Sequence, residues 1–131
     1  MTATDHALEL VRTAARAASD KLATNIVAFD VSEQLAITDA FLLASASNDR
    51  QVKAIVDEVE DKLREIGAKP IRREGERDGR WVLIDYAEIV VHVQHTEERS
   101  FYALERLWRD TPPIDLSEAL AGPDSGPDSD Q

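Results

Sequence analysis

The 131-residue sequence contains no cysteine, which excludes disulfide bonds and thiolate chemistry. Apolar runs are short, and none approaches the roughly 20 residues that a membrane-spanning helix needs. The first residues, Met1–Asp5, have neither the basic region nor the apolar run of a targeting signal. We therefore expect a soluble, cytoplasmic protein with no membrane partner.

Positive charge is scarce as well. Lysine and arginine number 15 against 26 acidic residues, which gives a net charge of -11 and an isoelectric point near 4.6. Because nucleic-acid binding draws its affinity from cations that neutralise phosphates, a sequence-specific nucleic acid is not the expected partner. An acidic surface favours a basic partner, including the basic proteins that sit on RNA.

Signatures of catalysis are missing. The three histidines are His6, His92 and His95. Their spacing does not match a metal cluster. A magnesium site for nucleotidyl transfer needs two carboxylates at i and i+2 of a strand, but Asp85 has Leu83 and Ala87 at those positions. No glycine-rich phosphate loop is present. We expect no metal, no cofactor and no enzymatic activity; the alternative is a nucleotide-dependent enzyme using Asp39, Asp85 and His92.

Two amphipathic helices are predicted in the first half of the chain. Apolar residues at spacings of three and four indicate a helix over Asp5–Leu22, with Thr4 or Asp5 as N-cap. Its apolar stripe consists of Leu8, Val11, Ala15, Ala18 and Leu22. The second helix has Ser47 or Asn48 as its cap, a broad stripe that reaches Ile66, and Gly67 as its stop.

Strands alternate with these helices. Residues 25–31 and 39–46 are short and largely apolar, and two further runs rich in Val, Ile and Leu flank Tyr86-Ala87. The strand–helix–strand order predicts an α/β fold, a mixed β-sheet packed with α-helices and containing at least one crossover.

The two runs around Tyr86-Ala87 organise the rest of the chain. With a two-residue loop they form a hairpin in which Trp81, Leu83 and Asp85 face His92, Val90 and Glu88. This face, called the mixed face, combines an aromatic, an acid and a histidine, whereas Val82, Ile84, Ile89 and Val91 form an apolar face for the core. Trp81 is either an interface anchor or a core residue. Asp85 opposite Glu88 would repel it, and a basic partner would relieve that repulsion.

The C-terminal part is predicted to hold one more helix and a tail. Thr96 can cap a helix that carries Phe101, Leu104, Leu107 and Trp108 and stops before Pro112-Pro113. We expect one domain over residues 1–111 and a disordered acidic tail rich in Pro, Gly and Ser over residues 112–131.

The order of motifs resembles one protein family. The motifs are Ile37-Thr38-Asp39, Asp49-Arg50-Gln51-Val52, Glu74-Gly75, Trp81–Tyr86, Val90–Val93, and Arg99 with the helix that follows it. In this order, and over about Leu8 to Asp110, the chain is similar to the ribosomal silencing factor, or Iojap-like, family.

The resemblance implies a nucleotidyltransferase-like topology without catalytic residues. It further implies binding to the large ribosomal subunit through universal large-subunit ribosomal protein fourteen, a steric block to joining of the small subunit, and repression of translation under nutrient limitation. The contact residues it implies are Trp81, Leu83, Asp85, Tyr86, Glu97 and Arg99.

The chain departs from the family pattern at Ala46 and Ala87, where glycine is common, and at Gln94, where a large apolar residue is common. A two-residue turn of the primed type needs a positive φ at Ala87, which alanine resists. A longer loop with a shifted register is therefore open as well. A homodimer that uses the mixed face is a further possibility.

Overall fold

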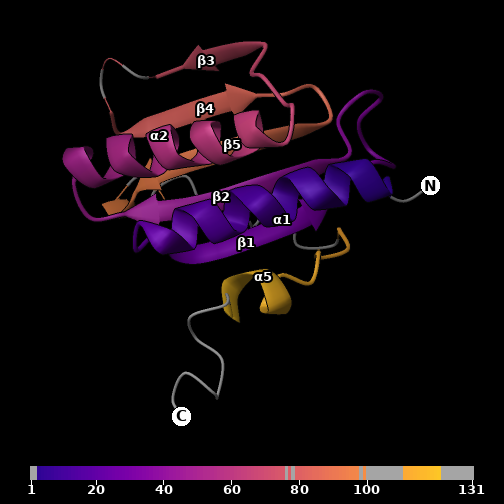
Figure 1. Ribbon diagram of the computed structural model, residues 1–131, viewed down its shortest axis with the longest axis horizontal. Coiled ribbons are helices and arrows are strands. Elements are labelled where there is room, and N and C mark those ends of the chain that lie inside the picture. Colours follow the sequence, from indigo (N-terminus) through magenta and orange to yellow (C-terminus); the bar gives the residue numbers. More distant parts are fainter. Residues whose placement is uncertain (1–2, 76, 78, 98, 100–110, 122–131) are drawn as a thin grey trace.

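The computed structural model describes residues 3–75, 77, 79–97, 99 and 111–121. Its centre is a mixed sheet of five strands in the order β1-β2-β5-β4-β3 (Figure 1). The strands are β1 Thr24–Asp30, β2 Ala40–Ala46, β3 Arg72–Glu74, β4 Trp81–Asp85 and β5 Ile89–His95. The β2–β5 pair is parallel and the other three pairs are antiparallel. This confirms the predicted α/β fold with one crossover between parallel strands.

Helix α1, Asp5–Asp20, begins where the sequence predicts. The side chain of Thr4 accepts a hydrogen bond from the amide of Ala7 at 3.0 Å and so caps the helix. The predicted end was wrong, because Leu22 adopts φ 67° and is 75% exposed. The buried side of the helix is also wider than the predicted stripe, and it includes Ala7, Leu10, Val11, Ala14, Ala15, Ala17 and Ala18.

Helix α2, Asp49–Glu65, matches its prediction at both ends. The side chain of Asn48 accepts from the amide of Gln51 at 2.8 Å, and the chain turns away at Gly67 with φ 91°. Val52, Ile55, Val56, Val59 and Leu63 are buried along one side. Ile66, at the end of the predicted stripe, is 40% exposed.

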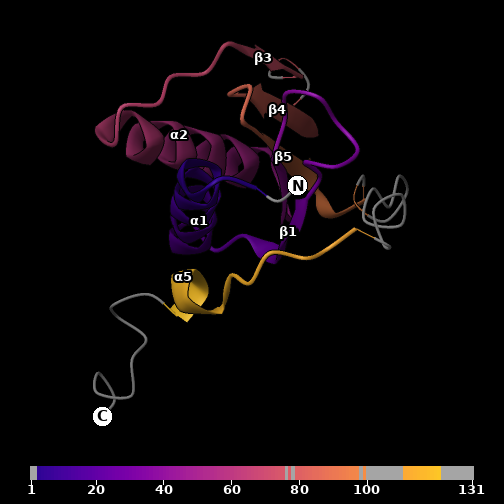
Figure 2. The ribbon, with the colours of Figure 1, turned by 90° about the vertical axis from the view of Figure 1, so that its right-hand side faces the viewer.

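Both long helices lie on the same face of the sheet (Figure 2). The core forms between them and the alternate residues of the strands, which include Leu42, Ile84 and Val91. Small side chains on α1 allow this close approach, since five of its buried residues are alanine. The opposite face of the sheet carries Trp81, Leu83 and Asp85, and neither α1 nor α2 covers it. No helix among the described residues has the length and hydropathy to cross a membrane.

The segment after Thr111 belongs to the fold, so the predicted domain boundary at residue 111 was wrong. Pro113 forms a β-bridge with Phe29, and the amide of Ile114 donates to the carbonyl of Ala28 at 2.9 Å. Ile114 and Leu116 join the core, and a short helix, α5 Ser117–Ala121, packs against α1. The Pro- and Asp-rich composition favours disorder, but the free energy gained by burying these apolar side chains is enough to hold the segment on the fold. The rest of the predicted tail, residues 122–131, lies outside the described residues.

The predicted helix after β5 can be followed only at its start. Residues 96, 97 and 99 are helical, whereas Phe101, Leu104, Leu107 and Trp108 lie outside the described residues. The amide of Glu97 donates to Nδ1 of His95 at 3.2 Å. His95 therefore occupies the capping position that was predicted for Thr96.

Candidate docking surface

The hairpin of β4 and β5 has a longer loop than the two-residue version and a register shifted by two residues. The facing pairs are Trp81 with Gln94, Val82 with Val93, Leu83 with His92, Ile84 with Val91, and Asp85 with Val90. Because side chains alternate with a period of two, a two-residue shift leaves the side chains of β4 and β5 on their predicted faces. Glu88 is the exception, since it lies in the loop and its carboxylate reaches His6 of α1. The predicted pairs were therefore wrong, while the division into an apolar and a mixed face is correct.

The loop explains the shift. Ala87 does adopt the left-handed conformation, with φ 69°, and the chain closes through a bond from the amide of Tyr86 to the carbonyl of Ile89 at 2.9 Å. The carboxylate of Asp85 accepts from the amide of Ala87 at 2.8 Å. This side-chain bond stabilises a conformation that alanine otherwise disfavours.

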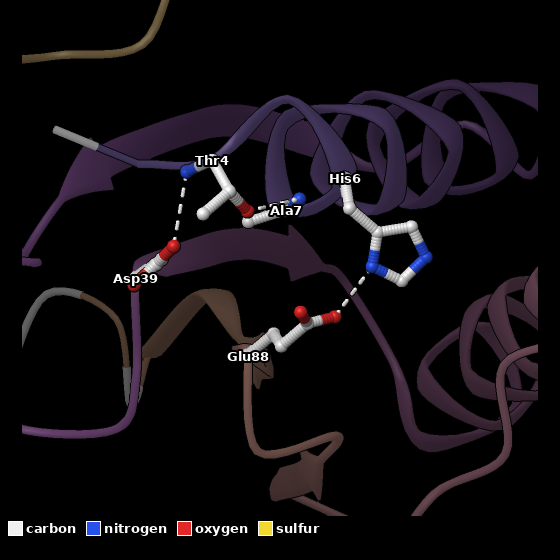
Figure 3. Close-up of polar contacts among 5 residues, drawn as sticks. All are labelled: Thr4, His6, Ala7, Asp39 and Glu88. Carbon is white, nitrogen blue, oxygen red and sulfur yellow. Dashed lines mark hydrogen bonds and ion pairs between the residues drawn. The ribbon is translucent and has the colours of Figure 1, made fainter.

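The predicted repulsion between Asp85 and Glu88 was wrong. Asp85 lies opposite Val90 and forms an ion pair with Arg72 at 3.3 Å. Glu88 points toward helix α1, where its carboxylate lies 2.6 Å from Nδ1 of His6 (Figure 3). A basic partner is therefore not required to separate these two acids.

Trp81 lies partly buried on the mixed face. Its indole Nε1 donates a hydrogen bond to Nδ1 of His92 at 3.1 Å, and the ring of His92 also meets Phe41 edge-on. His92 is only 6% exposed, and burial lowers its pKa to about 4. Together with the partly buried Leu83 and Asp85, Trp81 thus presents a rigid apolar edge with a carboxylate beside it.

Tyr86 lies on the other face. It is 6% exposed and belongs to the core cluster beside α2. Burial raises the pKa of Tyr86, and the nearby carboxylate of Glu60 acts in the same direction. Its hydroxyl has no hydrogen-bond partner among the described residues. The structure therefore does not bring Tyr86 together with Trp81 on one surface.

Glu97 and Arg99 differ in exposure. The carboxylate of Glu97 is exposed and accepts a hydrogen bond from Nη2 of Arg80 at 2.8 Å. Arg80 directly precedes Trp81 in the chain. Arg99 is 5% exposed, and its Nη1 donates to Oγ of Ser45 at 2.7 Å. Glu97 can thus extend the surface around Trp81. Arg99 instead links the start of the helix after β5 to β2 through its hydrogen bond with Ser45. Sequence reasoning missed Arg80 and Ser45, because both act through partners distant in the sequence.

Gln94 is another residue whose role the sequence did not reveal. It lies between Ser45 of β2 and Trp81 of β4 in the sheet and is fully buried. Neither atom of its amide has a hydrogen-bond partner in the part of the chain that the structure describes. Among the described residues, the mixed face therefore carries an amide without hydrogen-bond partners directly beside Trp81.

At the opposite end of β2, acidic side chains hold the beginning of α1 (Figure 3). Asp39 accepts from the backbone amide of Thr4 at 3.0 Å, and Asp30 accepts from that of Ala3 at 2.9 Å. Burial acts to raise the pKa of Asp30, but hydrogen bonds from Ser32 and Ala3 outweigh it and lower the pKa. Asp39 therefore has a structural function here.

Comparison with known proteins identifies the family. A family model described as "Ribosomal silencing factor during starvation" matches residues 4–131. The chain belongs to the ribosomal silencing factor family. A ribosomal silencing factor of Bacillus subtilis is 42% identical over 107 residues, which cover 82% of this chain and 91% of that protein. The chloroplastic protein Iojap of Zea mays is 32% identical over 105 residues, covering 78% of this chain and 44% of that protein.

Solved structures share the fold. A crystal structure of a Chromobacterium violaceum protein has a TM-score of 0.74 at 34% identity and covers 76% of this chain and 83% of its own. A Bacillus halodurans protein has a TM-score of 0.72 at 39% identity, covering 82% of this chain and 98% of its own. The predicted family resemblance and fold are confirmed.

Ribosomal silencing factors are regulators and not enzymes, so the enzymatic alternative falls with the family assignment. The candidate catalytic groups all have structural partners: Asp39 binds Thr4, Asp85 binds Arg72 and Ala87, and His92 binds Trp81. Within the described residues no group of three or more His, Asp or Glu could hold a metal ion.

Proposed function

We propose that this chain binds the large ribosomal subunit through universal large-subunit ribosomal protein fourteen and sterically blocks joining of the small subunit. Translation in the cytoplasm would thereby be repressed when nutrients are limiting. The family description, which names silencing during starvation, supports the physiological setting. The net charge of -11 supports docking onto a basic ribosomal protein.

The observation that carries the proposed surface is the position of Trp81. It lies at the start of β4, partly buried, on the sheet face that α1 and α2 leave uncovered. Large aromatic side chains in such positions are the commonest interface anchors. Leu83 and Asp85 lie along the same strand face, and Glu97 beyond Arg80 adds a further carboxylate. Tyr86 and Arg99 are buried and would not contact the partner directly. Their proposed role is to support the hairpin and the start of the helix that holds Glu97.

Sedimentation of ribosomal subunits tests the function. Purified large and small subunits are mixed with and without the chain and separated on a sucrose gradient. Whole ribosomes should fail to form when the chain is present, and the chain should travel with the large subunit. Formation of whole ribosomes in undiminished amounts would contradict the proposal.

We propose in addition that a homodimer, where it forms, uses the same mixed face. Dimerisation and docking then compete for one surface, so the dimer must dissociate before the ribosome binds. The apparent affinity for large subunits should fall as the concentration of the chain rises. An affinity that is constant while the dimer forms would contradict a shared surface.

A further inference from the structure

Helices α1 and α5 lie next to each other (Figures 1 and 2). Residues of both helices line a cavity of about 320 Å³. It is lined by Arg12, Thr13 and Arg16 of α1 and by Glu118 and Ala119 of α5. The proposed docking surface occupies the other face of the sheet, so the cavity is independent of it.

Two arginines of the same charge occupy one wall. Arg12 and Arg16 are four residues apart, one helical turn, which is slightly unfavourable for an isolated helix. Both are exposed, and neither forms an ion pair with a carboxylate among the described residues. In contrast, Arg64 is paired with Asp61 on α2. Among the described residues, the acidic group that interacts with this pair is Asp115, whose pKa is lowered by the hydrogen bonds from Ser117 and then by the charge of Arg12.

The guanidinium of Arg12 is held in place. Its Nε donates to the backbone carbonyl of Asp115 at 3.3 Å, which leaves its two terminal nitrogens for another acceptor. The carboxylate of Asp115 accepts from the amide and hydroxyl of Ser117, at 2.9 and 2.7 Å, and its interaction with Arg12 is electrostatic and not a direct ion pair. Among the described residues Glu118 is the single acid that lines the cavity, so the described lining carries one net positive charge.

We propose that Arg12, Thr13 and Arg16 bind a phosphate group, carried either by a small phosphorylated molecule or by an RNA backbone. The planar guanidinium donates two parallel hydrogen bonds to phosphate oxygens, a geometry that lysine does not offer. The hydroxyl of Thr13, one residue from Arg12, supplies a third donor. The cavity is open and large enough for a phosphate together with part of the molecule that bears it.

The test is a titration of the full chain followed by nuclear magnetic resonance of its backbone amides. Inorganic phosphate is one probe and a short oligouridylate is the other. Each should shift the amide of Thr13 saturably. The double variant Arg12→Gln/Arg16→Gln should lose affinity about tenfold or more. Glutamine favours helices nearly as well as arginine, so α1 should persist, and circular dichroism checks this.

The matched control is Lys53→Gln/Arg64→Gln, which removes the same charge from exposed pairs on α2. It should bind both probes like the parent chain. Saturable binding of oligouridylate that weakens steeply with salt identifies RNA as the source of the phosphate, and binding of inorganic phosphate alone identifies a small molecule. The absence of saturable shifts with both probes, or equal loss in both double variants, would overturn the proposal.

Discussion

The indole nitrogen of Trp81 donates to Nδ1 of His92 across two neighbouring strands, at 3.1 Å. This bond requires Nδ1 to be unprotonated and so fixes the neutral tautomer with its proton on Nε2. That second nitrogen is buried and has no partner among the described residues. A proton added to Nδ1 of His92 would break the hydrogen bond from Trp81. It would also place a buried positive charge on a ring for which the described residues offer no acceptor.

The stability of the fold should therefore depend on pH through His92. Its pKa falls from 6.5 to about 4 on folding because of burial, so the unfolded state takes up the proton first as the pH drops. Above pH 6.5 His92 is neutral in both states and does not reduce the free energy of unfolding. Between pH 6.5 and pH 4 the free energy of unfolding should fall progressively, by about 3 kcal/mol in total. Urea unfolding across this pH range, compared with His92→Gln, isolates the effect. Parallel pH profiles for the two chains would contradict it.

Replacing Trp81 with alanine should weaken binding to large subunits by at least ~2 kcal/mol, because an anchoring aromatic is lost from the mixed face. The measurement is co-sedimentation with purified large subunits. The same change removes the hydrogen bond to His92, so folding of the variant is verified by its unfolding transition. The control is Leu22→Ala, which truncates an exposed apolar side chain in the turn after α1 and should bind normally. Unchanged binding by the Trp81 variant would exclude the proposed surface.

Gln94→Met should raise the free energy of unfolding by about 1 to 3 kcal/mol. Both polar atoms of the buried amide lack partners among the described residues, and methionine fills a similar volume without them. Ser45→Ala is the contrasting variant, since it removes the acceptor that Arg99 uses and should destabilise. Chemical denaturation measures both. A destabilised Gln94→Met chain would contradict this and would mean that the amide has a partner outside the described residues.

Gly75→Ala should be strongly destabilising. A Cβ at this position would lie 2.0 Å from the carbonyl oxygen of Trp81, and the residue has φ 86°. Gly67→Ala is the matched control, because Gly67 has a similar φ of 91° with nothing within 4 Å of the added atom. The control should lose about 1 kcal/mol from backbone strain alone. Equal losses in the thermal unfolding of the two variants would show that the clash is relieved.

Tyr86→Phe tests whether the hydroxyl of Tyr86 contributes to docking. The hydroxyl is buried without a partner among the described residues, so its removal should leave the unfolding free energy unchanged or slightly higher. Binding to large subunits should also be unaffected if Tyr86 only supports the hairpin. Weaker binding with full stability would instead place the hydroxyl in contact with the partner.

Local signals in the sequence predicted much of the fold. The ends of α2 were predictable because they depend on residue type. Asn48 caps the start with a side-chain hydrogen bond, and Gly67 adopts the positive φ that ends the helix. The two faces of the hairpin were predictable because side chains alternate along a strand, and a register shift of two residues does not change the face on which a side chain lies. The register was not, since it depends on how the carboxylate of Asp85 stabilises the positive φ of Ala87.

Features set by distant contacts could not be predicted. Ile114 and Leu116 stand among Pro and Asp residues, and only their contact with the core makes them part of the fold. Tyr86 is an exception, because the even-numbered residues of β4 face the core and alternation along the strand already places Tyr86 inward. The partners of Arg99 and Glu97 come from other elements. Sequence patterns indicate which side chains are amphipathic, and tertiary packing decides where they lie.

The two borders of the sheet determine how the molecule can associate. Residues 112–114 run along β1 and bond to its backbone, while β3 at the other border has three exposed residues with charged side chains. Neither border offers a long apolar strand onto which another chain could add. Strand-by-strand polymerisation is thereby disfavoured, and self-association through one face stops at a closed pair.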